Sequence, residues 1–86
     1  VGTGLLREVI THAKTEGCKR VWLITTNDNT SAMHFYQRRG FVFAAIYINA
    51  MQISRQMKPQ IPLTGIDGIP LRDEIEMEYP LFLEVT

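Results

Sequence analysis

The residue run that best suggests chemistry lies in the middle of the chain, directly after an apolar stretch. Its skeleton is Asn29-x-x-Ala32-x-x-x-Tyr36-x-x-x-Gly40-Phe41. Asn29 is a favourable helix N-cap, and Ala32 and Tyr36 are one turn apart, so they share a helix face. The small Ala32 leaves room for a slender ligand beside the helix, where Tyr36 would present its hydroxyl. A positioned phenol can act as a general acid toward a thiolate leaving group.

The residues alone favour a structural interpretation of the same run. Phe35 and Tyr36 could simply be core aromatics on the buried side of an amphipathic helix.

A second candidate is Gly2-Thr3-Gly4, at the predicted start of a helix. The first N–H groups of a helix have no intrahelical partner and carry a partial positive charge, so they can hold an anion. Glycines let the backbone come close to a phosphate. Two glycines before a helix are more often an ordinary loop than a phosphate site, so this motif needs support from the first one.

These residues must be positioned by local structure, and the apolar periodicity predicts three helices alternating with three strands. In chain order the predicted elements span residues 4–16, 20–26, 30–39, 41–48, 50–58 and 74–79. The strand at 20–26 is apolar on both sides, which predicts cover on both of its faces. A loop rich in proline and glycine occupies residues 60–70. The fold class predicted is α/β, with a small three-stranded sheet.

Composition bounds the function further. A chain of 86 residues suits one small domain, and its 45% hydrophobic and 21% charged residues are ordinary for a globular protein. Nine basic and nine acidic residues balance, so no net field favours nucleic acid or a membrane surface. The single Cys18 rules out an internal disulfide and fits a reducing, cytoplasmic compartment. Neither His12 nor His34 has an acidic neighbour at ligand spacing, so no metal site is predicted.

Together, the two motifs resemble the second half of a Gcn5-related N-acetyltransferase, a family that uses acetyl-coenzyme A as co-substrate. The resemblance covers nearly the whole chain and is strongest from Val21 to Phe41. It implies an acyl-CoA N-acyltransferase fold in which the last of the three strands inserts between the other two, in the antiparallel order first, third, second.

The resemblance also implies roles for individual residues. Gly2, Thr3 and Gly4 look like the end of the loop that binds the coenzyme A pyrophosphate. The other implied cofactor-binding residues are Asn29, against the pantetheine arm, Ala32 and Tyr36. Tyr36 is also the implied general acid, which protonates the thiolate after an amine attacks the thioester directly. Arg38 occupies a position that is often basic in the family, near the 3′-phosphate or simply in solvent.

Much of the family domain would lie before residue 1, including the strand that often supplies a general base. We therefore expect residues 1–86 to form a single partial domain with a cut end, inactive alone, and a strand at 21–26 with one bare edge. The alternative function is a non-catalytic half-domain that forms a homodimer, or pairs with another chain, through that edge. The resemblance implies an amine acceptor that is a small molecule or a peptide. Asp67 and Asp73 are candidates to attract it, while the carboxylates at 74, 76 and 78 are expected to be a solvated strand face.

Overall fold

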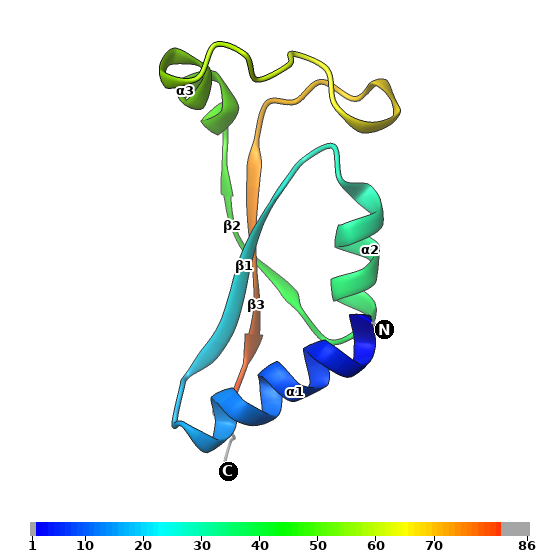
Figure 1. Cartoon of the computed structure of the whole chain (residues 1–86), viewed down its shortest axis with the longest axis vertical. Coiled ribbons are helices and arrows are strands. Elements are labelled where there is room, and N and C mark those ends of the chain that lie inside the picture. The colour runs from blue at the N-terminus through cyan, green and yellow to red at the C-terminus, as the bar shows by residue number, and fades with distance from the viewer. Residues whose placement is uncertain (1, 82–86) are drawn as a thin grey trace.

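The computed structural model describes the backbone of residues 2–81 and the side chains of residues 4–81. Helices and strands alternate along the chain as the periodicity predicts (Figure 1). In order they are α1 (Gly2–Thr15), β1 (Arg20–Thr26), α2 (Thr30–Arg38), β2 (Val42–Tyr47), α3 (Ala50–Met57), the 3₁₀ helix η1 (Ile66–Gly68) and β3 (Glu74–Pro80). The predicted α/β class is confirmed.

The last strand in sequence, β3, lies in the centre of the sheet. The order is β1-β3-β2, and β3 is antiparallel to both neighbours. Met77 of β3 lies opposite Leu23 of β1 and Phe43 of β2, and the pairing with β2 shifts register between Phe43 and Ala45. The predicted order first, third, second is therefore correct.

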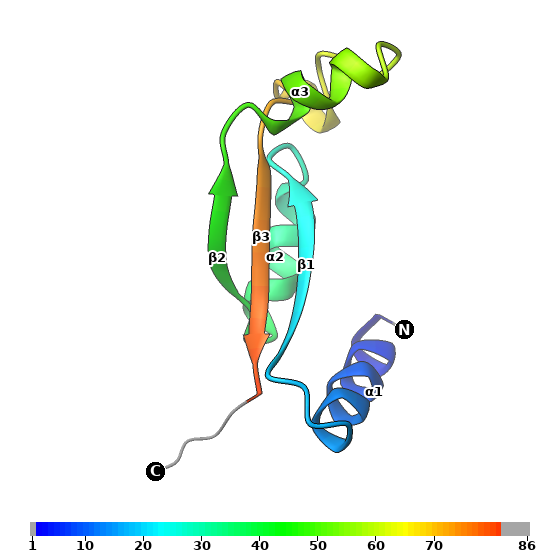
Figure 2. The same ribbon diagram turned by 90° about the vertical axis from the view of Figure 1, so that its left-hand side faces the viewer.

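One face of the sheet carries the hydrophobic core, against which helices α1 and α2 pack. Phe41, Ile75 and Met77 form the buried cluster, and Phe41 and Met77 are 2% and 0% exposed. Partly buried side chains from α1 and α2 pack against this cluster, among them Leu6 and Met33. Figure 2 shows the three strands in front of α2, with α1 beyond the lower end of the sheet. Both main helices thus contribute to the same core.

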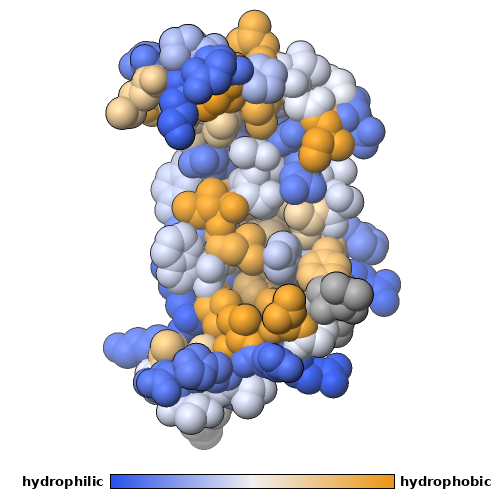
Figure 3. Space-filling model, in the orientation of Figure 1, coloured by the Kyte–Doolittle hydropathy of each residue, from blue (hydrophilic) through white to orange (hydrophobic). Residues whose placement is uncertain are grey.

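The opposite face of the sheet is open in the described part of the chain. Trp22 and Ile24 of β1 are 53% and 46% exposed there, so the prediction that this strand is covered on both faces is wrong for residues 2–81. Figure 3 looks at the neighbouring side of the molecule, the β1 edge, where apolar side chains gather over the middle and polar ones over both ends.

The acidic strand β3 does not present a simply solvated row on the open face. Arg20 Nη1 lies 2.6 Å from Glu76 Oε2 and 2.8 Å from Glu78 Oε1. The Tyr47 hydroxyl donates to Glu76 Oε1 at 2.6 Å. The hydrogen bond from Tyr47 and then that from Arg20 hold the pKa of Glu76 below its ordinary value. The three strands are therefore joined by polar side chains as well as by backbone hydrogen bonds.

Helix ends follow local sequence signals with two adjustments. Gly17 and Gly40 have positive φ angles of 77° and 99°, as expected after a helix. α1 begins at Gly2, two residues earlier than predicted. Asn49 occupies the N-cap position of α3, but it is left-handed and makes no side-chain cap. Its backbone N–H is instead bonded to the Asp73 carboxylate at 2.8 Å.

The two glycines provide a paired stability test. A Cβ at Gly40 would lie 2.9 Å from Tyr79 Cε2, whereas a Cβ at Gly17 would meet nothing within 4 Å. Gly17→Ala should cost about 1–2 kcal/mol from the left-handed backbone alone. Gly40→Ala should cost about 1–3 kcal/mol more, because Tyr79 must move away from Phe41. Urea unfolding of both variants measures the difference, and equal losses would show that the Tyr79 contact is immaterial.

Candidate functional site

The first predicted motif forms the start of α2, immediately after β1. Asn29 is the N-cap, as predicted, and its Oδ1 accepts from the Ala32 backbone N–H at 3.2 Å. The Ser31 hydroxyl donates to the same oxygen at 3.3 Å. The Asn29 amide nitrogen makes no hydrogen bond to any described residue. Asn29 therefore caps the helix with its oxygen and keeps a donor for another partner.

Tyr36 is placed one turn beyond Ala32 on the inner side of α2, and both are half-buried. The Tyr36 ring packs edge-on against Phe35 and Phe41, with ring centroids 5.1 and 5.2 Å apart. Its hydroxyl makes no hydrogen bond within the described residues. The ring thus belongs to the core, as the structural interpretation holds, while the hydroxyl remains available.

The glycines of the second motif lie in the first turn of α1, not in a loop before it. Gly2, Thr3 and Gly4 therefore include backbone N–H groups that the helix itself cannot satisfy. A Cβ at Gly4 would meet nothing within 4 Å, so the backbone is open to a close-lying ligand there.

A basic cavity between α1 and the core was missed at the sequence level. Its volume is about 280 Å³, and Arg7, Lys14 and Arg39 are among its lining residues, together with Tyr79. Arg7 and Lys14 are two helical turns apart, so the sequence could have predicted that they share one side of α1. The sequence could not have predicted that Arg39, at the end of α2, lies near them. Arg39 also donates to the Phe35 carbonyl at 3.0 Å and stacks on that ring.

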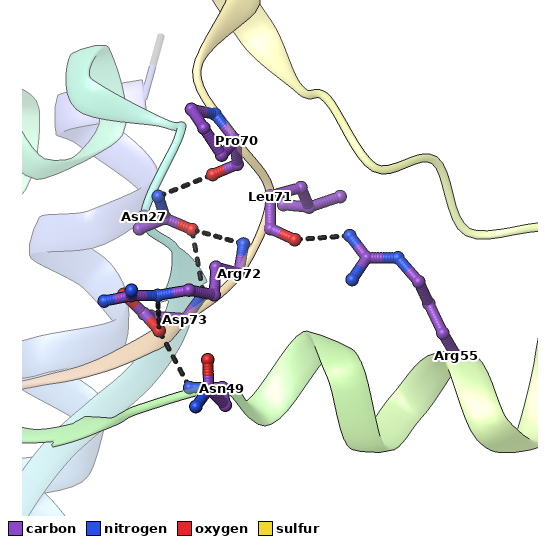
Figure 4. Close-up of polar contacts among 7 residues, drawn as sticks. All are labelled: Asn27, Asn49, Arg55, Pro70, Leu71, Arg72 and Asp73. Carbon is purple, nitrogen blue, oxygen red and sulfur yellow. Dashed lines mark hydrogen bonds and ion pairs between the residues drawn. The ribbon is translucent and has the colours of Figure 1, made fainter.

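The polar residues after β1 bind the segment that precedes β3. The Asn27 side chain donates to the Pro70 carbonyl at 2.8 Å and accepts from the backbone N–H groups of Arg72 and Asp73, both at 2.9 Å (Figure 4). Asp73 Oδ1 in turn accepts from the Asn49 backbone N–H. The ends of all three strands are therefore tied together at one point.

A second anchor comes from α3. The Arg55 guanidinium donates to the carbonyls of Ile61 and Pro62, at 3.2 Å and 2.7 Å. It also donates to the Leu71 carbonyl (Figure 4). One side chain thus closes both ends of the loop predicted at residues 60–70.

Asp28 is the buried charge of this region, at 5% exposed. Its Oδ2 accepts from the Ile66 backbone N–H at 2.8 Å. The Thr26 hydroxyl, and then this backbone N–H, lower the pKa of Asp28 below its ordinary 3.8 despite burial. No local sequence pattern singles out Asp28, because its partner lies 38 positions away.

The other residues singled out from the sequence are not brought into one site. Asp73 is used in the strand-end contacts, and Asp67 is exposed at a left-handed position with φ of 57°. His12 and His34 are exposed on separate helices. Across residues 2–81 no group of three or more His, Cys, Asp or Glu is arranged to hold a metal ion. No helix in the same range has the length and hydropathy that a membrane crossing requires.

Comparison with known proteins matches this geometry to one family. Residues 1–41 match the model of the acetyltransferase (GNAT) family. YdhI of Bacillus subtilis (strain 168), an uncharacterized protein, is 51% identical over 75 residues, which are 87% of this chain and 47% of YdhI.

Solved structures give the same result. A GNAT family acetyltransferase from Elizabethkingia anophelis, crystallised with acetyl-CoA, superposes with a TM-score of 0.77 and 28% identity over 93% of this chain and 49% of that one. A Bacillus subtilis acetyltransferase in complex with CoA has a TM-score of 0.78 at 23% identity, over 94% of this chain and 50% of that one, and shows the fold alone.

These matches confirm the resemblance to the second half of a GNAT acetyltransferase, and the three strands have the order of the acyl-CoA N-acyltransferase fold. The chain spans about half the length of the relatives that it matches.

The lowered pKa of Asp28 gives a pH test. A carboxylate with a depressed pKa stabilises the fold above its unfolded pKa, and this contribution is lost as the pH falls through the folded value. The difference in unfolding free energy between the wild type and Asp28→Asn should be constant well above pH 3.8 and shrink below it. Urea unfolding at a series of pH values measures it. Asp67→Asn, at an exposed carboxylate of the same segment, is the control, and parallel curves for both variants would contradict the assignment.

Proposed function

We propose that this chain supplies part of an acetyltransferase site, in which an acetyl group passes from acetyl-coenzyme A to an amine of a small molecule or peptide. The observation that carries the proposal is a pair of residues on α2. Tyr36 is half-buried and its hydroxyl has no partner within the described structure, and the small Ala32 lies one turn earlier. The GNAT relative crystallised with acetyl-CoA supports the choice of co-substrate.

The residues of this chain have distinct proposed tasks. The backbone N–H groups of Gly2, Thr3 and Gly4 bind the pyrophosphate at the N-terminus of α1. The spare amide nitrogen of Asn29 donates to a carbonyl of the pantetheine arm, which lies along the surface left open by Ala32. These contacts place the thioester beside Tyr36.

In the proposed acetyl transfer this chain supplies one proton donor, the Tyr36 hydroxyl. The amine nitrogen attacks the thioester carbonyl, the carbon–sulfur bond breaks, and the sulfur takes the proton of the Tyr36 hydroxyl. The nitrogen loses its own proton to a base outside residues 1–86 or to water. Positioning and proton donation together account for the acceleration in such a scheme.

Coenzyme A binding tests the role of Asn29. Titration calorimetry with the chain should show saturable binding that is weakened at least fivefold by Asn29→Ala. Asn29→Ser keeps a side-chain oxygen for the cap but removes the amide donor. Equal weakening by both variants would assign the effect to the lost donor. No heat with the wild type up to millimolar coenzyme A would contradict the proposal.

Tyr36→Phe tests the acid. Removing the hydroxyl should leave coenzyme A affinity within about twofold and lower acetyl transfer by about 10²–10⁴, the usual contribution of a general acid. Tyr47→Phe, on the open face of the sheet, is the matched control and should transfer at the wild-type rate. Thiol release from acetyl-CoA measures both variants, in a longer chain that carries the segment, because residues 1–86 are expected to be inactive alone. A Tyr36→Phe variant as active as the wild type would remove Tyr36 from the mechanism.

The second candidate function is a non-catalytic half-domain that forms a homodimer through β1. It is favoured by one observation, the lack of a strand partner on the outer edge of β1 in residues 2–81, next to the exposed Trp22 and Ile24. Unpaired apolar edges promote association between chains.

Light scattering coupled to size exclusion tests this candidate. A dimer of the wild type that Ile24→Lys converts to monomer would support it, because a charge beside the edge opposes pairing. Ile53→Lys places the same charge on α3, at a side chain that is 62% exposed, and should change nothing. A wild-type chain that is monomeric at every concentration would exclude association through β1.

A further inference from the structure

The segment between α3 and β3, residues 58–73, has the composition of a mobile loop but the contacts of a fixed one. It has three prolines, two glycines and a single short helix, η1. Loops of this length usually move or serve as binding elements. Here Thr64 bridges to Pro70, and Leu71 N–H donates to the Leu63 carbonyl at 2.9 Å. The segment thus forms its own hairpin before it meets the rest of the domain.

Asp28 joins that hairpin to the site. The Asp28 carboxylate is buried, and burying a charge is unfavourable unless it is well bonded. It is not needed to cap α2, because Asn29 does so. Within the described structure its carboxylate has one hydrogen bond of good geometry, which Oδ2 accepts from the Ile66 N–H. The other oxygen, Oδ1, is buried and has no such partner. The nearby Thr26 hydroxyl helps to keep the carboxylate charged by lowering its pKa. The buried position of the Asp28 carboxylate is therefore explained by its contact with the Ile66 backbone.

Gly65 is shaped to the same contact. Its φ of −107° requires no glycine, yet a Cβ there would lie 2.1 Å from Asp28 Oδ2 and 2.6 Å from Asp28 Cγ. No side chain fits while the carboxylate is in place. Two residues far apart in the sequence are therefore matched to each other.

We propose that Asp28 is a positioning residue: it holds the Gly65–Ile66 turn beside the N-terminus of α2, so that residues 58–73 form a fixed wall on the side where the amine enters. This proposal rests on the proposed function, because Asn29, the next residue, is the proposed contact of the pantetheine arm. The wall presents Leu63, Ile66 and Asp67, which are all exposed. It suits an amine that carries an apolar group, since Asp67 would attract the amine and the two aliphatic side chains would contact the apolar group.

Amide hydrogen exchange by NMR tests the positioning without any assay of activity. Asp28→Ala should reduce protection at least tenfold at the N–H groups of Ile66, Ile69 and Leu71, and leave Met77 in the central strand unchanged. Gly65→Ala should do the same, and the double variant should be no worse than Asp28→Ala, because removal of the carboxylate relieves the overlap. Asp67→Asn is the control in the same turn and should leave protection intact. Unchanged protection in Asp28→Ala, or an equal loss at Met77, would overturn the proposal.

Kinetics tests whether the wall belongs to the acceptor side. With acetyl-CoA and benzylamine as the probe amine, Asp28→Ala should raise the KM for the amine at least fivefold and keep the KM for acetyl-CoA within twofold. Asp28→Asn, which retains an acceptor oxygen for Ile66, should recover most of the affinity for the amine. Equal changes in both KM values would overturn the acceptor-side assignment. Because residues 1–86 are expected to be inactive alone, this assay uses a longer chain that carries the segment. A longer wild-type chain without transferase activity would sink the proposed function instead, and hydrogen exchange would still decide the role of Asp28.

Discussion

β3 supplies the pairing on which both other strands depend, because β1 and β2 are hydrogen-bonded to β3 and not to each other. The buried cluster is completed by the same strand, through Ile75 and Met77. A chain folded only as far as β2 would have two separate strands and no shared core. The helices that carry the proposed site are thus stabilised by a strand that follows them in the sequence.

The position of β3 also explains why polar residues gather at one end of the sheet. A central strand that follows a long connection must be held in register at its entrance. Asn27 at the end of β1 and Asn49 after β2 both bond to the start of β3, through Asp73 and its neighbours. The backbone groups bound here lie where strand pairing begins, so these side chains set the register as well as close the loop.

The contacts along β1 and α2 relate stability to the proposed chemistry. Tyr36 contributes its ring to the core and leaves its hydroxyl unbonded within the described residues. Asn29 similarly uses its oxygen for the cap and keeps its nitrogen. In both residues one part fixes the position of the side chain and the other part remains free. Such a division permits a site that is already rigid before a ligand binds.

The sequence by itself determined the local elements and the order in which they occur. Apolar periodicity located the helices and strands, and the Asn29 cap and the left-handed Gly17 and Gly40 were readable because each depends on residues within one turn. The resemblance to one family then supplied the strand order, which periodicity cannot give. The composition of the β1 strand was misleading, since an apolar side chain reports a tendency to be buried and not the presence of a cover.

Only the tertiary structure decided which distant groups meet. Asp28 and Ile66 are 38 positions apart, and Arg20 and Glu76 are 56 apart. Neither pair leaves a local signature, because an acid in a turn or on a strand usually faces water. The insertion of β3 brings these residues together, and the burial of Asp28 against the Ile66 backbone distinguishes it from an ordinary turn aspartate. The sequence therefore identified the residues of the proposed chemistry, and the fold identified those that hold them in place.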